Sequence, residues 1–384
     1  MSLRRVLLLS LCLPAAAVAQ STVTVSREPT LRLPATTASG DARFSTAGWA
    51  TRLASGAIAV ADVGDAVIHV FAADGSKQRT LGRRGRGPGE FQFAGWVGRC
   101  GSDSLVVWDF AAGRVTTLSA TEPLAPNPPT RQIAGGQGSF VAACGASGQL
   151  ALFVDTRPRN DAPPIAAGRT SQGGEYRISP VGAAVEVSDK SGRVLSRLDG
   201  VMQSEMVMGS LTAEGGRGGF PRPLGNATSV AFAGDRLVVA YADSSRVIGY
   251  STDGKEVFRF SVPPSAAKVT PEDYRRAMAP AFAMMPGQMR DRLVAFAEAV
   301  PAPTTAPSFW RVLTDPTGLI WLAVSPEGAK ATVLRAYDDK GRQHAEITLT
   351  DGAVPFEIGR DYVLGRSEDE DGEQAIVLYR IVRR

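Results

Sequence analysis

The side chains best suited to chemistry in this sequence are arginines with aromatic residues near them. A guanidinium group donates two parallel hydrogen bonds to a carboxylate or phosphate, and it also stacks on flat rings. Such a set favours an acidic ligand, for example an acidic peptide or glycan. The candidate ligand-binding residues are Arg43, Arg83, Arg86, Trp96, Phe220 and Arg222. Acidic residues such as Glu90 and Glu175 are interspersed among the arginines of these loops, so an ordinary solvated surface is the alternative.

Residues suited to catalysis are scarce. The chain has two histidines, His69 and His344, and it contains no HExxH, GxSxG or CxxC motif. The common zinc, serine-hydrolase and redox sites are therefore not predicted. Asp62, Asp109 and Asp243 each follow a short apolar strand, a position that favours hydrogen bonds to the backbone of a turn over metal binding. We predict no catalytic residue, no metal ligand and no cofactor.

A repeated unit must position these side chains. It consists of a glycine, an alternating apolar strand, a polar turn, a second alternating strand and then Asp-Gly or an equivalent turn. Clear copies occupy residues 56–82, 101–118, 234–260 and 317–349, and degenerate copies occupy 148–198 and 359–383. One small sheet cannot bury its own faces, whereas six sheets packed radially bury both faces and leave only short edges. The repeat therefore predicts an all-β chain, a six-bladed β-propeller that forms one domain over residues 20–384.

Each blade of such a fold needs an innermost strand beside the central channel. We assign these strands to Gly48–Leu53, Phe93–Cys100, Phe140–Cys144, Ala227–Phe232, Phe309–Thr314 and Val354–Ile358. The polar and aromatic residues near the ends of these strands are Trp49, Trp96, Asn226, Asp315 and Glu357. They include too few carboxylates to predict a metal-binding ring.

Two segments carry a resemblance to known proteins. Residues 56–95 end in a Gly85-Arg-Gly-Pro-Gly-Glu-Phe91 crossover and resemble the NHL-type propeller repeat. The tail from Ile358 to Ile381 resembles the closing blade of bacterial exported six-bladed propellers of unknown function. Several other six-bladed families, including lactonases and amidating lyases, are enzymes that hold a divalent metal in the channel. The resemblance therefore leaves a metal-dependent hydrolase or lyase open as the alternative function.

One segment departs from the strand pattern. Thr270, Pro271 and Asp273 have the order of a capped helix start, and apolar residues recur at helical spacing between Pro286 and Ala299. We predict a short helical insertion at about 265–300, between the fourth and fifth blades.

The N-terminus is typical of an export signal. Arg4 and Arg5 precede a short apolar run, and Ala17-Val-Ala19 has small residues at the positions that signal peptidase prefers. We expect a signal peptide at 1–19, a periplasmic or extracellular location, and no transmembrane segment. A formal net charge of +4 on 384 residues is too small to indicate nucleic-acid binding.

Two further predictions concern how the fold is held together. Cys100 and Cys144 each end an innermost strand, so adjacent blades would bring them together as a disulfide. Two buried free thiols are the alternative. Residues 22–33 alternate as a strand, and we predict that they complete the last blade beside Gln374–Val382.

The function that these observations favour is that of an exported, monomeric binding or scaffold protein. Its partner would be a protein, a peptide or a glycan, or it would hold a small ligand on its loop face. The residues do not identify the ligand.

Overall fold

Strands make up most of the backbone, as the alternating apolar residues predict. The structure is a computed structural model that describes residues 23–36, 39–101, 104–133, 139–156, 163–170, 174–210, 217–282 and 287–384. The predicted signal peptide lies outside these residues and stays a prediction. Within the described ranges, neither helix is long and apolar enough to cross a membrane.

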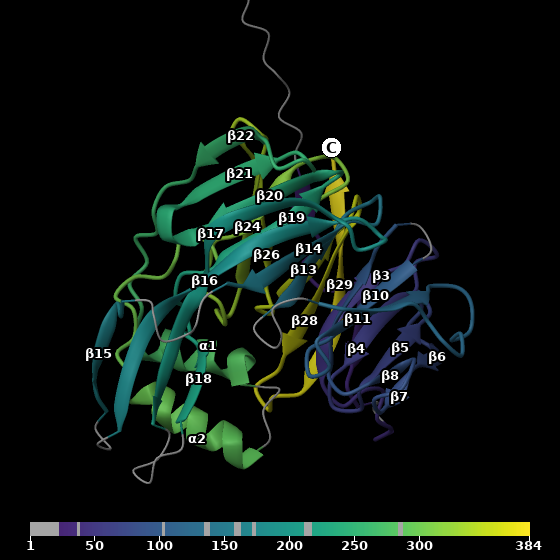
Figure 1. Cartoon of the computed structure of the whole chain (residues 1–384), viewed down its shortest axis with the longest axis horizontal. Coiled ribbons are helices and arrows are strands. Elements are labelled where there is room, and N and C mark those ends of the chain that lie inside the picture. The colour runs from purple at the N-terminus through teal and green to yellow at the C-terminus, as the bar shows by residue number, and fades with distance from the viewer. Residues whose placement is uncertain are drawn as a thin grey trace, which may run out of the picture.

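Six antiparallel sheets of four or more strands follow one another along the described chain (Figure 1). The first sheet contains β3 (Ala47–Arg52), β4 (Ile58–Asp62), β5 (Val67–Phe71) and β6 (Lys77–Leu81). The second contains β9 (Ala94–Arg99), β10 (Ser104–Asp109), β11 (Arg114–Ser119) and β12 (Thr130–Gln132). The third contains β13 (Phe140–Cys144), β14 (Leu150–Asp155), β15 (Ala166–Arg169), β16 (Glu175–Ser188), β17 (Val194–Ser210) and β18 (Arg217–Pro221).

The remaining sheets keep the same order. The fourth contains β19 (Thr228–Ala233), β20 (Arg236–Tyr241), β21 (Arg246–Tyr250) and β22 (Glu256–Ser261). The fifth contains β23 (Arg311–Thr314), β24 (Ile320–Ala323), β25 (Thr332–Tyr337) and β26 (Gln343–Leu349). The sixth contains β27 (Val354–Ile358), β28 (Tyr362–Glu368) and β29 (Gln374–Arg383), together with β1 (Val23–Val25) and β2 (Leu31–Pro34) from the N-terminal end. A small parallel pair, β7 (Arg83–Arg84) and β8 (Glu90–Phe91), lies in the crossover between the first two sheets.

The first strands of the six sheets form a closed cycle. β3 contacts β9, β9 contacts β13, β13 contacts β19, β19 contacts β23, β23 contacts β27, and β27 contacts β3. All six coincide within one or two residues with the innermost strands assigned from the sequence. Six apolar clusters fill the spaces between successive sheets, each built from the facing side chains of two neighbours. Both faces of the inner strands are therefore buried, and every residue of β4 and β5 is in the core.

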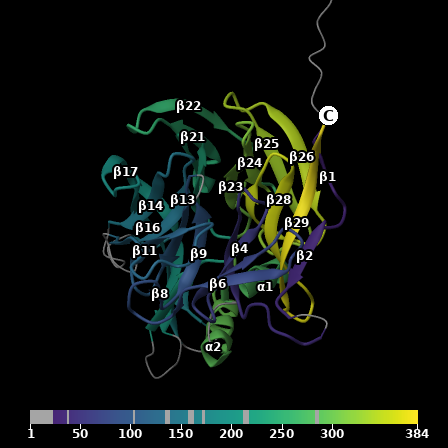
Figure 2. The same cartoon turned by 90° about the vertical axis from the view of Figure 1, so that its right-hand side faces the viewer.

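The two ends of the described chain meet in the sixth sheet. Val25 pairs with Ile381, and Leu33 pairs with Ile376. Figure 2 shows β1 and β2 running beside β29. The predicted completion of the last sheet by the N-terminal strands is confirmed.

The predicted helical insertion is also confirmed as α1 (Pro271–Phe282) and α2 (Gly287–Glu298). The side chain of Thr270 accepts a hydrogen bond from the Asp273 amide at 3.1 Å, and the Asp273 carboxylate accepts one from the Thr270 amide at 3.0 Å. This reciprocal pair satisfies amide groups at the helix start that would otherwise lack partners. Both helices lie beside β18 at the end of the molecule away from the C-terminus (Figure 1).

The third sheet is larger than the sequence repeat indicates. The repeat places its third copy at 148–198, but β16 and β17 continue as a long ribbon, with Tyr176 paired to Gly209. Their outer part packs on the helical insertion in a separate cluster that includes Ile178, Val207 and Phe296. The insertion covers an apolar ribbon that would otherwise be exposed to solvent.

Candidate ligand-binding cavity

The six first strands surround a cavity of about 1020 Å³. Residues from all six strands line it, because these strands are the innermost of their sheets and form the closed cycle around it. A register shift in β27 between Pro355 and Glu357 lies beside two residues of the wall, Phe356 and Glu357. Bulges of this kind commonly redirect side chains at functional sites.

Aromatic rings form much of the wall. The lining rings are Trp49, Phe93, Trp96, Trp108, Phe110, Phe140, Phe153, Phe232, Trp310, Phe356 and Tyr362. Several are paired: the Trp49 and Phe356 ring centres are 4.5 Å apart in a stack, and those of Phe140 and Phe153 are 4.9 Å apart. The charged residues on the wall are Arg99, Arg311, Asp315 and Glu357. Apolar walls with a few fixed polar groups are typical of small-molecule sites.

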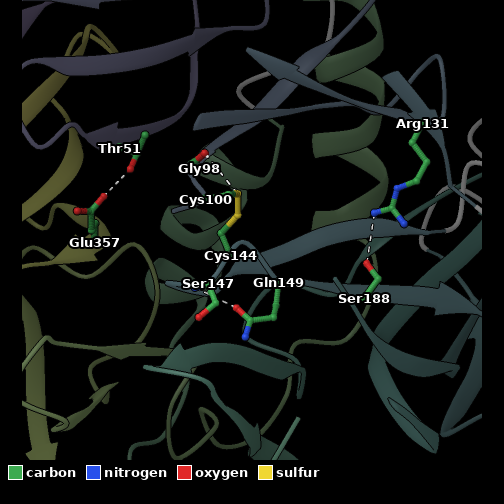
Figure 3. Close-up of a disulfide and its surroundings, with 9 residues drawn as sticks. All are labelled: Thr51, Gly98, Cys100, Arg131, Cys144, Ser147, Gln149, Ser188 and Glu357. Carbon is green, nitrogen blue, oxygen red and sulfur yellow. Dashed lines mark hydrogen bonds between the residues drawn. A yellow bond between two sulfur atoms is a disulfide. The ribbon is translucent and has the colours of Figure 1, made fainter. Parts of the chain in front are cut away.

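The Glu357 carboxylate is held by neighbouring strands. Its Oε2 accepts hydrogen bonds from the Thr51 hydroxyl at 2.6 Å, visible in Figure 3, and from the Arg52 amide at 3.1 Å. Its Oε1 accepts a hydrogen bond from the Tyr362 hydroxyl. Burial raises the pKa of Tyr362 well above its ordinary range, and the negative charge of Glu357 raises it further. The phenol therefore stays a donor, and both oxygens of Glu357 accept hydrogen bonds from the protein.

The second carboxylate of the wall, Asp315, is also engaged. It accepts hydrogen bonds from the Trp321 indole at 2.8 Å, from the Arg383 guanidinium at 2.7 Å and from the Thr317 amide at 2.8 Å. Burial alone would raise the pKa of Asp315, but these hydrogen bonds and the Arg383 charge hold it below its usual value. Asp315 therefore fixes the turn after β23.

Arg311, unlike the two acids of the wall, is held by aromatic rings and a backbone carbonyl. Its Cζ lies 4.7 Å from the ring centre of Trp49 and 5.2 Å from that of Trp310, and its Nη1 donates to the Pro355 carbonyl at 3.0 Å. Within the described ranges, no carboxylate forms an ion pair with it. Burial lowers the pKa of Arg311 to about 10, so the group is still cationic at neutral pH.

A disulfide joins two neighbouring strands at the rim of the cavity. Cys100 follows β9 and Cys144 ends β13; their Cα atoms are 5.3 Å apart, and the bond is visible in Figure 3. This is the pairing expected from the equivalent places of the two cysteines in their repeats.

One potential cation-binding group occurs elsewhere in the described chain. Ligand atoms of Asp62, Asp65 and His69 lie within 4.8 Å of one another, and none of these residues lines the cavity. The Asp62 carboxylate accepts hydrogen bonds from the amides of Ser45, Thr46 and Gly64 and is close to His69 Nε2 at 3.2 Å. Its role in the structure is to fix a turn, as the sequence indicates.

The six residues predicted to bind ligand lie in different environments. Trp96 is buried and lines the cavity. Arg43 is half-buried, Arg86 is exposed, and Arg83 is an exposed partner of Glu90. Their binding of an acidic partner stays a prediction.

Phe220 and Arg222 have structural contacts. Phe220 is buried and packs edge-to-face on Phe282 and Phe296 of the helical insertion, with ring centres 5.0 and 6.0 Å away. Arg222 pairs with the buried Glu205 at 2.9 Å and also donates to the Pro301 carbonyl. Both side chains therefore attach the insertion to the third sheet.

Sequence reasoning named Trp49, Asp315 and Glu357 near the innermost strands but did not identify Thr51 or Arg311. An arginine within an innermost strand, directly after a tryptophan, is the signal that could have indicated Arg311.

Comparison with known proteins gives similarity in structure alone. No protein-family model matches the chain, and no curated protein is significantly similar to it in sequence. A Bacteroides fragilis protein inferred to be exported is 11% identical to this chain, with a TM-score of 0.46. The match spans 96% of this chain and 98% of that protein. A catalytically inactive virginiamycin B lyase from Staphylococcus aureus, solved with quinupristin, is 10% identical, with a TM-score of 0.38. The match spans 94% of this chain and 99% of that protein. The β-propeller domain of Cps50 (Swd1) from Myceliophteria thermophila is 11% identical, with a TM-score of 0.39. The match spans 91% of this chain and 98% of that domain.

Proposed function

We propose that this protein is an exported, monomeric, single-domain six-bladed β-propeller that binds a small ligand in its central cavity. The closed cycle of first strands, with one apolar cluster between each pair of neighbouring sheets, supports the six-bladed architecture. The charged, apolar and small-residue segments of residues 1–19 support export.

The observation that carries the binding function is the cavity itself. It is lined by all six first strands, it is large enough for a small organic molecule, and its wall combines stacked rings with fixed polar groups. We therefore propose a small-ligand site at the centre of the molecule, whereas the sequence analysis expected it on the loop face.

The donor chemistry of the wall favours binding over metal-dependent hydrolysis or elimination. A catalytic divalent ion needs carboxylate or imidazole groups that are free to coordinate it. Asp315 and Glu357 use their oxygens for hydrogen bonds to the protein, and neither histidine lines the cavity. The lyase or hydrolase alternative would have to break these contacts.

A cavity-filling variant tests the proposal. Ala142 lines the wall, so Ala142→Trp should occupy ligand space, whereas Val257→Trp adds the same side chain at an exposed outer-strand position. A mixed small-molecule library is screened by ligand-observed NMR against the parent and both variants, with near-UV circular dichroism to verify folding. We expect ligands that bind the parent and Val257→Trp but not Ala142→Trp. Ligands that bind all three proteins equally, or no ligands at all, would contradict a cavity site.

A further inference from the structure

The cavity contains a fixed cation that forms no ion pair with any of the described residues. Arg311 is the first residue of β23, and its one hydrogen bond among the described residues goes to a neutral carbonyl, that of Pro355. The two carboxylates of the wall have other partners, since Asp315 pairs with Arg383 and Glu357 accepts hydrogen bonds from Thr51 and Tyr362. The guanidinium therefore has donors left over on the cavity wall.

The position of this guanidinium is fixed in advance. The Trp310 indole donates to the Ser325 carbonyl at 2.9 Å, and Trp49 stacks on Phe356, so both rings next to Arg311 are themselves anchored. The Pro355 carbonyl holds one edge of the fork from the neighbouring sheet. A preorganised group loses little conformational entropy when a ligand binds.

The other charges nearby do not neutralise Arg311. The charge of Glu327 acts on Arg311, but no ion pair joins the two among the residues described, and burial raises the pKa of Glu327 above its usual value. Arg366, which donates to the Ala47 carbonyl, adds a second positive charge in the same region. A half-buried cation without a paired anion is unfavourable, and an anionic ligand would reduce that penalty.

We propose that Arg311 binds the oxyanion of a flat, apolar carboxylate whose ring system lies against the aromatic wall beside Trp49. This inference rests on the proposed cavity function and specifies the class of ligand. A carboxylate matches the two-pronged geometry of guanidinium, and a planar apolar body matches the stacked rings that surround it.

Two probes of nearly equal shape test the ligand class. 2-Naphthoate and 2-naphthamide share one ring system and differ in charge, and both are titrated calorimetrically into the parent protein. We expect the parent to bind naphthoate about tenfold more tightly than naphthamide, as for a charge-assisted hydrogen-bonded pair. Arg311→Gln should abolish this preference, while Arg259→Gln, at an exposed position of β22 outside the cavity, should leave it within about twofold.

The outcomes separate the two proposals. Equal affinity for the two probes in the parent, a preference that survives Arg311→Gln, or no binding at millimolar concentration would each overturn the role of Arg311. Binding that persists in Ala142→Trp would instead overturn the cavity as the site.

If Arg311→Gln does not fold, Arg311→Lys is used, since it keeps the positive charge but not the two-pronged geometry of the guanidinium. It should retain a weaker preference for naphthoate than the parent, and an undiminished preference would contradict bidentate recognition.

Discussion

Asp62 shows how one buried carboxylate organises a whole turn at the scale of single residues. It is the last residue of β4, its side chain is fully buried, and it accepts hydrogen bonds from the amides of Ser45, Thr46 and Gly64. Burial alone would raise the pKa of Asp62, but the hydrogen bonds from His69 and these amides outweigh it and hold the pKa well below its usual range. The ionised form is therefore part of the folded state.

The first prediction concerns the acid dependence of stability. Asp62→Asn should lower the free energy of unfolding by about 2–3 kcal/mol at pH 7, because a charged acceptor of several amides is lost. A pKa that is lower in the folded than in the unfolded state stabilises the protein above the ordinary carboxyl pKa of about 4, and this stabilisation is lost as the pH falls further. The difference in free energy of unfolding between the parent and Asp62→Asn should thus become smaller as the pH falls from roughly 5 to 3, as measured by urea unfolding.

Asp243 provides the control for this measurement. It lies in the short turn that follows β20, where it is exposed and accepts a hydrogen bond from the Ser244 hydroxyl. Asp243→Asn should change the stability by less than about 0.5 kcal/mol. A difference between parent and Asp62→Asn that is the same at both ends of the pH range would contradict the role assigned to the Asp62 charge.

At the scale of elements, an ion pair attaches the helical insertion to the third sheet. Arg222 follows β18, and Glu205 lies on β17; both side chains are nearly buried, and Asn226 donates to the second oxygen of Glu205 at 2.9 Å. Arg222 also reaches the Pro301 carbonyl just beyond α2. The contact therefore connects the ribbon of β16 and β17 with the chain that returns from the helices.

The second prediction tests this attachment. Arg222→Ala should destabilise the fold by about 3–5 kcal/mol, because Glu205 is left as a buried charge without its partner. Hydrogen exchange should accelerate most in α1 and α2. The exposed Arg83–Glu90 pair is the comparison, and Arg83→Ala should cost less than about 1 kcal/mol.

A double variant separates charge from packing. Arg222→Leu with Glu205→Leu removes both charges and should recover most of the stability that Arg222→Ala loses. A double variant as unstable as the single one would show that the ion pair is not the reason for the loss.

Sequence reasoning succeeded for elements whose signals are local. Alternating residues with a turn at each end locate the innermost strands, and Thr270 with Asp273 locates the start of α1. It missed the extension of β16 and β17, because the length of a strand beyond a turn depends on what covers it, here the helical insertion. Sequence reasoning missed Arg311 because its guanidinium is positioned by residues of other sheets, Trp49 and Pro355, which are far away in sequence.

At the scale of the whole molecule, the sixth sheet joins the two ends of the chain. Leu33 is fully buried in the cluster between the first and sixth sheets, and β1 and β2 cover an edge of β29 that would otherwise be unpaired. An uncovered edge strand loses hydrogen bonds and is prone to pair with other molecules.

The third prediction follows from this closure. Deleting residues 23–34 should lower the melting temperature by roughly 5–10 °C, since a loss of several kcal/mol shifts a large domain by about 2–4 °C per kcal/mol. Thr24→Ala, at an exposed position of β1, is the control and should have little effect. Light scattering should also detect association of the deleted form. A melting curve identical to that of the parent would show that the N-terminal strands do not hold the cycle closed.

The pairing of the two chain ends also has a consequence for the order of events during synthesis. Thr30 donates a hydrogen bond to Leu378, a partner 348 residues later. At about 5–20 residues per second, a ribosome needs roughly 20–70 s to make the intervening chain, so β1 and β2 wait that long without a partner. The sixth sheet can form only when the last strand is released, whereas the strands of the other five sheets are complete before then. Until then the N-terminal strands are available to holding chaperones, and a protein truncated near its C-terminus would leave them unpaired.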